Sequence, residues 1–302
     1  MNLEFNLVKF PLLFPVLYGS ILYLFPSYEF ILIFFTILFL AETHFGATWP
    51  FFLNKINSDF IKENRVSLIS FPIIITVFSL IGYFYFKATF LLIFFAVNMF
   101  HVTRQSFGVC KLYTKKSIEI KFQETLIYIA NFSFFLIGFF RFYLPLISNE
   151  QLFLLNLIVT ILLFIILLVY FLKFNSLDSF FTFFTGLIIF YPICFVQNPV
   201  HAIIMGVTMH YTQYLYLTHK VFKGREINNE KKSNRFKYFI IIIFYAVIMS
   251  ILSLFGKSSN EILNYLIIIP IVGQMLHFYL DSQLWKFSNP HNRENVLKHI
   301  KR

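Results

Sequence analysis

Charged residues are scarce in this sequence. Only 13% of the 302 residues are Asp, Glu, Lys or Arg, whereas 58% are hydrophobic and 45 are Phe. Several apolar runs exceed 18 residues, the length that crosses a bilayer as a helix, and no soluble fold needs so much apolar surface. The scarcity of charge therefore excludes a water-soluble globular protein and predicts a polytopic integral membrane protein.

Several other features are rare or missing. The two cysteines, Cys110 and Cys194, form no CxxC pair, which excludes a disulfide framework and a cysteine zinc site. The short alternating strands of a transmembrane barrel are lacking, and no small-residue cleavage site follows Lys9, so we expect the first apolar segment to be retained. We predict an all-α fold: one transmembrane helical bundle over residues 1–302, with short loops and a basic cytoplasmic C-terminal tail over residues 287–302.

The apolar segments number about ten, and each has the length of a membrane-spanning helix. They cover residues 7–25, 29–47, 66–86, 88–110, 123–147, 151–172, 179–197, 199–221, 236–255 and 261–286.

The basic residues indicate how these segments are oriented. Of the 25 Lys and Arg residues, 20 lie in the connections after even-numbered segments or in the tail, and only Lys87 and Lys257 follow odd-numbered ones. Because basic loops stay in the cytoplasm, we predict cytoplasmic N- and C-termini and even-numbered helices that descend toward the cytoplasm. The net charge of +11 then reflects membrane orientation, and we expect no nucleic acid partner. We expect a multi-pass protein of a bacterial inner membrane, surrounded by membrane lipids.

Polar residues inside the segments gather on four of the even-numbered ones. Ionisable groups at membrane depth are costly and usually face the bundle interior. The second segment ends with Glu42 and His44, the fourth carries His101, Arg104 and Gln105, the eighth carries His210, Gln213 and Tyr214, and the tenth carries His277 and Asp281.

Histidines from different segments share one depth. His101, His210 and His277 precede the next Lys by ten, ten and nine residues, which at about 1.5 Å per residue places all three about 14–15 Å above it. His44 has a similar spacing of eleven residues, across the bend that Pro50 predicts. Four descending helices that present an imidazole at one level favour a single polar site in the bundle core.

These residue types suit a metal ion, although each histidine taken alone is more often a hydrogen-bonded packing residue. Imidazole and carboxylate ligands with open positions are typical of non-haem iron, so Fe is the first choice and Zn, Cu or Mn are alternatives. Side chains near the ligands would orient them or the substrate. We predict His44, His101, His210 and His277 as metal ligands, Glu42 or Asp281 as the completing carboxylate, and Arg104, Gln105, Gln213 and Tyr214 as catalytic or orienting residues.

The remaining polar residues are expected at the periphery, with one exception. His201 lies at the outer end of the eighth segment, His219 near the cytoplasmic surface, and His291 and His299 in the basic tail. Arg104, in contrast, lies deep enough in its segment to need a carboxylate partner such as Glu42 or Asp281.

The arrangement is similar in style to the membrane non-haem iron oxygenases of the desaturase and hydroxylase class, which hold clustered histidines near the cytoplasmic face. Their HxxxH and HxxHH boxes are missing here. The tripeptide His44-Phe45-Gly46 also resembles one in bacterial carotene-cleaving membrane oxygenases, but their paired-histidine motif in a late helix is missing. The sequence therefore carries no family assignment.

We expect a membrane-bound, metal-dependent oxidoreductase that hydroxylates, desaturates or cleaves a lipid or isoprenoid substrate at the cytoplasmic side, with an electron donor protein as a partner. One alternative is a metal-free lipid acyl- or glycosyl-type transferase in which a histidine is the general base. Another is a proton- or ion-coupled transporter. The lack of an inverted repeat and of paired broken helices weakens the transporter hypothesis.

Overall fold

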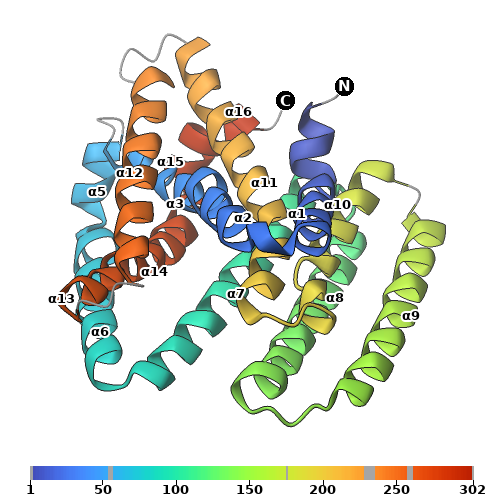
Figure 1. Ribbon diagram of the computed structural model, residues 1–302. Coiled ribbons are helices and arrows are strands. Elements are labelled where there is room, and N and C mark those ends of the chain that lie inside the picture. Colours follow the sequence, from blue (N-terminus) through green and yellow to red (C-terminus); the bar gives the residue numbers. More distant parts are fainter. Residues whose placement is uncertain (1–2, 54–56, 175, 228–234, 257–260, 301–302) are drawn as a thin grey trace. The chain divides into compact units, whose positions relative to one another are not determined.

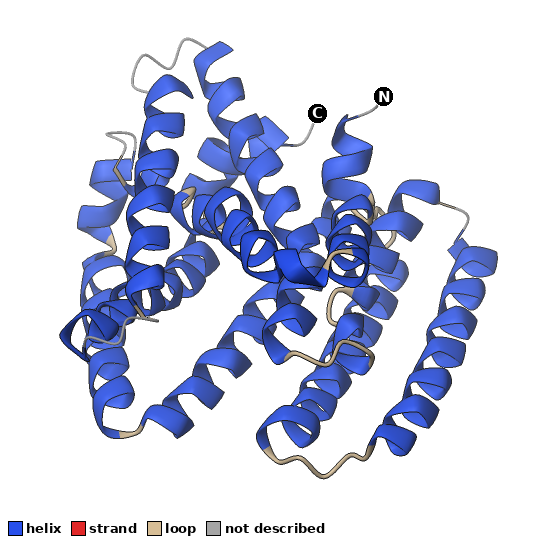
Figure 2. Ribbon diagram, in the orientation of Figure 1, coloured by secondary structure: helices blue, strands red, loops and turns tan. Residues whose placement is uncertain are grey.

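The computed structural model describes residues 3–53, 57–174, 176–227, 235–256 and 261–300. Every regular element among these residues is a helix, and none of them forms a strand (Figure 2). The predicted all-α class is therefore confirmed.

Sixteen α-helices follow one another along the described chain (Figure 1), and short 3₁₀ or π-helical stretches extend several of them. Their bounds are α1 Leu13–Leu24, α2 Glu29–Thr36, α3 Glu42–Gly46, α4 Trp49–Phe52, α5 Ser58–Glu63, α6 Phe71–Tyr85, α7 Lys87–Tyr113, α8 Ser117–Gly138, α9 Asn149–Phe174, α10 Leu177–Ile188, α11 Pro199–Ile227, α12 Arg235–Phe255, α13 Glu261–Asn264, α14 Ile268–Leu284, α15 Pro290–Asn292 and α16 Lys298–Ile300.

Eight helical stretches of the described chain are long and apolar enough to cross a membrane, and these long apolar helices indicate a multi-pass membrane protein. Each overlaps one of the predicted segments. They are Pro26–Phe52, Val66–Tyr85, Lys87–Tyr113, Ser117–Tyr143, Asn149–Phe174, Leu177–Cys194, Arg235–Phe255 and Tyr265–Leu284.

Two predicted spans differ from this set. Near the N-terminus the chain is interrupted at Phe10 (φ −144°, ψ 69°), because Pro11 disfavours the helical conformation in the residue before it. The remaining helix α1 has 12 residues, about 18 Å, which is too short to span alone. Helix α11 has 29 residues but is too polar to belong to the apolar set. The count of ten spans and the cytoplasmic placement of the termini therefore stay predictions.

The chain divides into two compact units. Unit 1 comprises Met1–Ile33 and Met99–Gln213, and unit 2 comprises Phe34–Asn98 and Tyr214–Arg302. The divisions fall inside helices α2, α7 and α11.

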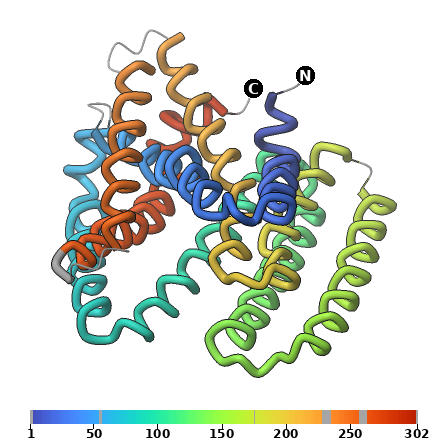
Figure 3. The backbone as a smooth tube through the Cα atoms, viewed as in Figure 1, coloured from blue at the N-terminus to red at the C-terminus, as the bar shows by residue number. Residues whose placement is uncertain are grey.

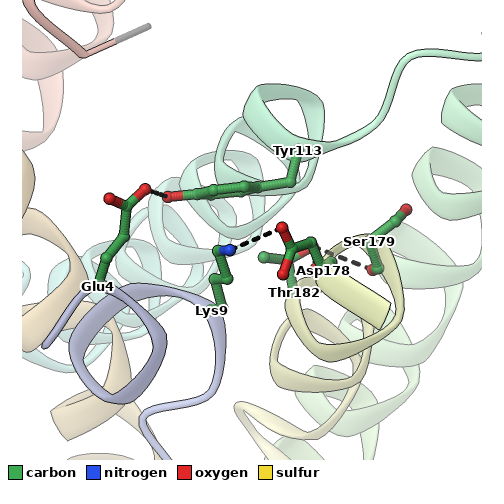
Figure 4. A network of polar contacts seen from close by, with 6 residues as sticks. All are labelled: Glu4, Lys9, Tyr113, Asp178, Ser179 and Thr182. Carbon is green, nitrogen blue, oxygen red and sulfur yellow. Dashed lines mark hydrogen bonds and ion pairs between the residues drawn. The ribbon is translucent and has the colours of Figure 1, made fainter. Parts of the chain in front are cut away.

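In unit 1, helix α10 packs against α8, α9 and the N-terminal segment Phe5–Lys9. A salt bridge of 2.7 Å joins Lys9 Nζ to Asp178 Oδ2 at this junction, and the Tyr113 hydroxyl donates to Glu4 Oε1 at 2.7 Å (Figure 4). Deeper in, the buried Glu119 carboxylate accepts hydrogen bonds from Tyr170 and Ser179. These bonds compensate for the cost of burying polar groups between apolar helices.

In unit 2, helix α12 packs against α3, α4 and α14, and α14 packs against α6. Glycines make the close approach of α12 possible. A Cβ at Gly46 of α3 would lie 3.0 Å from Tyr245 Cδ1, and a Cβ at Gly273 of α14 would lie 2.6 Å from Tyr245 Oη. The ring of Tyr245 thus fits against two helices only because both positions lack a side chain.

The C-terminal segment is packed into unit 2 rather than extended as a tail. The fully buried Arg225 donates from Nε and Nη2 to the carbonyl of Asn295, at 3.0 and 2.7 Å. The backbone of this segment runs beside α11 (Figure 3). His299 is buried, and a Cβ at Gly224 of α11 would come 2.7 Å from its Nδ1. His291 stacks on Phe60 with ring centroids 4.3 Å apart. His299 is therefore buried and not at the periphery expected for it, whereas the expected peripheral position of the half-buried His291 stays a prediction.

Candidate metal and acid–base site

The predicted site residues fall into both units, and each unit is described by itself. Unit 2 contains Glu42, His44, Tyr214, His277 and Asp281, and all five side chains are at least 98% buried. Unit 1 contains the other predicted residues, which are His101, Arg104, Gln105, His210 and Gln213.

Helix α3 places the first histidine of unit 2. Four of its five residues, Glu42, His44, Phe45 and Gly46, are buried, because α12 covers the helix through Tyr245. A turn at Ala47–Thr48 separates α3 from α4, which begins with Trp49 and Pro50. Ala47 and Thr48 keep helical backbone angles, so Thr48 follows the buried His44 by one helical turn.

His44 and His277 form an aromatic cluster with Tyr214. The ring centroids of His44 and His277 are 4.5 Å apart with an interplanar angle of 66°. Tyr214 lies 4.4 Å from His44 and 5.6 Å from His277, again edge to face. Phe45 contacts His277 at 5.1 Å. Two imidazoles of unit 2 thus lie side by side in an aromatic, water-poor environment.

Hydrogen bonds join His277 to Thr48 and Tyr214. Thr48 Oγ1 lies 2.7 Å from His277 Nδ1 and 2.8 Å from the Tyr214 hydroxyl. One turn after His277, Asp281 accepts a hydrogen bond of 2.6 Å at Oδ1 from Trp285 Nε1. The role of Asp281 as a ligand or an orienting carboxylate stays a prediction.

Glu42 has a weaker hydrogen-bond donor than Asp281 has. Gln274 Nε2 approaches Glu42 Oε1 at 3.5 Å, the limit of a weak hydrogen bond. Its other oxygen, Oε2, is buried and has no hydrogen-bond partner among the described residues. A buried carboxylate oxygen normally needs a donor or a cation, so Glu42 is the better candidate for a metal ligand.

Unit 1 brings together a second pair. His101 of α7 and His210 of α11 lie edge to face, with ring centroids 5.4 Å apart, and both are buried. His44, His101 and His277 are three buried histidines of the kind that could bind a metal ion. Imidazole suits several transition metals, so these ligands do not determine which one.

The other predicted residues of unit 1 have different surroundings. Gln213 is buried and donates from Nε2 to the carbonyl of Val8 at 2.7 Å, which ties α11 to the N-terminal segment. Gln105 is partly exposed. Arg104 is exposed and lies near Tyr128 of α8. Arg104 therefore lies on the surface of unit 1, and its predicted carboxylate partner, Glu42 or Asp281, stays a prediction.

His201 also differs from the expectation of an interfacial residue. It is 99% buried in unit 1, where Nδ1 lies 2.7 Å from the Tyr18 hydroxyl and Nε2 lies 2.7 Å from Glu29 Oε1. The ring joins α1, α2 and α11 through these bonds. A depth argument along α11 alone could not foresee it, because both partners come from distant parts of the sequence.

No protein-family model, curated protein or solved structure matches this chain.

Proposed function

We propose that this chain is an integral membrane metalloenzyme, a histidine-ligated non-haem iron oxygenase that acts on a lipid or isoprenoid substrate. The observation that supports it is the buried His44–His277 pair of unit 2, with Glu42 on the helix of one histidine and Asp281 on the helix of the other. With metal–nitrogen bonds of about 2 Å, two imidazoles that share an ion bring their ring centres to roughly 4–5 Å, which agrees with the observed 4.5 Å.

The proposed ligands differ in how they are supported. His44, His277 and Glu42 form the core, because Glu42 has a buried oxygen with no partner among the described residues. Asp281 is the second choice of carboxylate, because it already accepts a hydrogen bond from Trp285. His101 and His210 are further ligand candidates on the depth argument from the sequence, and Fe is the first choice of metal, with Zn, Cu or Mn as alternatives.

Iron would supply the activation of O₂. Hydroxylation then consumes one O₂, two electrons and two protons per C–H bond and releases one water, so it needs an electron donor protein. Oxidative cleavage of a C=C bond to two carbonyls uses both oxygen atoms and needs no donor. Phe45 and Phe278, whose rings lie 6.1 Å apart, line the His277 side with apolar surface that excludes water and suits a hydrocarbon chain.

Metal analysis of the detergent-purified protein tests this proposal. We expect stoichiometric iron in the wild type, and loss of at least 90% of it in His44→Ala and His277→Ala, because each variant removes a proposed ligand. His219→Ala is the control and should leave the metal content unchanged, since this half-buried histidine packs against Phe239 with ring centroids 5.6 Å apart. Glu42→Gln should weaken metal binding more than Asp281→Asn does.

A protein that is pure, active and free of transition metals would overturn the metal proposal. The His277 hydrogen-bond chain favours one alternative for that outcome, a lipid transferase in which His277 is the general base. In that case His277→Ala would abolish activity, and added metal ions or chelators would have no effect.

A further inference from the structure

We infer that the groove between helices α8 and α9 binds one anionic phospholipid, whose phosphate interacts with the ammonium groups of Lys121 and Lys173. The groove has a volume of about 330 Å³ and is lined by Ile118, Lys121, Phe122, Thr125, Leu126 and Lys173. All six residues belong to unit 1. The inference does not depend on the proposed function.

Helix α8 has a buried face and a separate face that lines the groove. Glu119, Gln123 and Ile127 recur every four residues, and each side chain is at most 3% exposed. The groove residues of α8 begin at Ile118, which is 65% exposed, and follow at i+3, i+4, i+7 and i+8. This spacing places them on one side of the helix. The groove therefore opens to the surroundings of the protein and not to its core.

Hydrogen bonds on the buried face hold the end of α9 beside the start of α8. The Tyr170 hydroxyl of α9 donates to Glu119 Oε1 at 2.6 Å and accepts from Gln123 Nε2 at 2.7 Å. Lys173 follows Tyr170 by three residues, so it reaches the same part of α8. The two walls of the groove are thus fixed by buried contacts, and a ligand meets a preformed site.

The two lysines make the groove positively charged. Lys173 Nζ lies 5.5 Å from the ring centroid of Phe122 and 5.4 Å from that of Phe174, so its ammonium group lies at the wall of the groove. Neither Lys121 nor Lys173 forms a salt bridge with a carboxylate of the described residues. Their charge is therefore available to an anion from outside the protein.

The position of the groove favours a lipid over a soluble anion. Lys121 and Lys173 lie near the start of α8 and the end of α9, at one end of two helices long and apolar enough to span a membrane, and bilayer phosphates lie at this level. Leu126 continues the groove one turn further along α8, where an acyl chain would follow. A single lysine at a helix end often only extends to the interface, whereas basic pockets between spanning helices bind anionic headgroups.

The predicted orientation agrees with this ligand. It places the start of α8 and the end of α9 on the cytoplasmic side, and the cytoplasmic leaflet is the one that carries a negative surface potential from anionic lipids.

Native mass spectrometry of the detergent-purified protein with defined lipids tests the inference. We expect the wild type to retain one dioleoylphosphatidylglycerol in preference to dioleoylphosphatidylcholine, which has the same chains and no net charge. Lys121→Gln combined with Lys173→Gln should lower the affinity for the anionic lipid about 30-fold, since each lysine near an anionic lipid contributes about 5-fold. The affinity for the neutral lipid should not change.

Two further variants distinguish the groove from net charge. Lys87 and Lys111 are exposed and lie over the rings of Tyr83 and Phe107, at 5.2 and 5.5 Å from the centroids. Lys87→Gln combined with Lys111→Gln therefore removes the same charge outside the groove, and the lipid preference should persist. Thr125→Trp keeps both groove lysines but fills the groove with an indole ring, and it should abolish retention of the anionic lipid.

Three results would overturn the inference. An equal loss in the Lys87 and Lys111 double variant would assign the preference to net charge alone. Wild-type retention in the Lys121 and Lys173 double variant, or in Thr125→Trp, would show that the lipid binds elsewhere. Displacement of the lipid by added inorganic phosphate would identify a site for a soluble anion.

Discussion

Gly273 shows how a single missing side chain shapes unit 2. An alanine Cβ there would lie 2.6 Å from Tyr245 Oη but 3.7 Å from Cζ, so the hydroxyl alone causes the clash. We expect Gly273→Ala to destabilise the protein by about 1–3 kcal/mol, as overpacking does. In a Tyr245→Phe background the same change should be tolerated. Thermal unfolding of the detergent-purified variants measures both.

The control for this prediction is Gly108 on the exposed face of α7, where a Cβ would meet no atom within 4 Å. Gly108→Ala should be neutral, or stabilising by up to about 1 kcal/mol, since alanine favours helix over glycine. Equal destabilisation by Gly273→Ala in both Tyr245 backgrounds would mean that the cost arises from the helix itself and not from the hydroxyl.

Single residues also mark where sequence reasoning succeeds and where it stops. His277 and Asp281 are predictable because i and i+4 on one helix share a face, and His44 because its depth matches theirs. Thr48 is not predictable, since threonine is common in apolar segments and its contact with His277 joins positions 229 residues apart. Arg104 shows a different limit: depth along a helix does not predict exposure, since Arg104 is exposed three residues after the buried His101.

At the scale of elements, we expect the packing of the C-terminal segment to depend on pH. His291 stacks on Phe60 and lies 2.7 Å from Asn57 Oδ1. Burial, and secondarily the positive charge of Arg225, lower the pKa of His291, while Glu63 and Glu294 partly oppose this. The packed state therefore binds a proton less readily than the released segment does.

The sign of the pH effect follows from this difference. Above the ordinary pKa of histidine, about 6.5, both states are neutral and packing is unaffected. As the pH falls below that value, the released segment takes up a proton first, so packing loses stability. We expect the hydrogen-exchange protection factors at residues 290–300, which are corrected for the intrinsic pH dependence of amide exchange, to fall between about pH 7 and pH 5, and we expect His291→Gln to remove this fall. Protection factors that stay constant or rise as the pH is lowered would contradict the lowered pKa.

Helices α1 and α11 show why element length is harder to predict than element type. Apolar composition predicts a helix over residues 7–25, but Pro11 interrupts it at Phe10 and leaves 12 residues in α1. Helix α11 is uninterrupted, but its polar side chains lower its hydropathy. A hydropathy value does not show that such side chains have hydrogen-bond partners inside the protein. Gln213, for example, donates to the carbonyl of Val8.

At the scale of the whole molecule, the distribution of Lys and Arg predicts the topology. Residues 115 and 226 belong to predicted cytoplasmic connections, residue 148 belongs to a predicted outer connection, and residue 197 is the predicted outer end of the seventh segment. We therefore expect a membrane-impermeant maleimide to label Ser148→Cys and Gln197→Cys in intact cells, and to label Lys115→Cys and Glu226→Cys only after lysis. The native cysteines Cys110 and Cys194 are buried and should contribute little background.

Labelling at positions 197 and 226 tests whether α11 is one of the ten predicted spans, because the two positions lie at opposite ends of this helix. If α11 crosses the membrane, the two cysteines respond oppositely; if it does not, they respond alike. An α11 that spans would carry His210 and Tyr214 at membrane depth, where an ionisable or hydroxyl side chain needs a partner or a function. An α11 that stays on one side would remove the common depth of the histidines, so the topology experiment also tests the ligand assignment of His210.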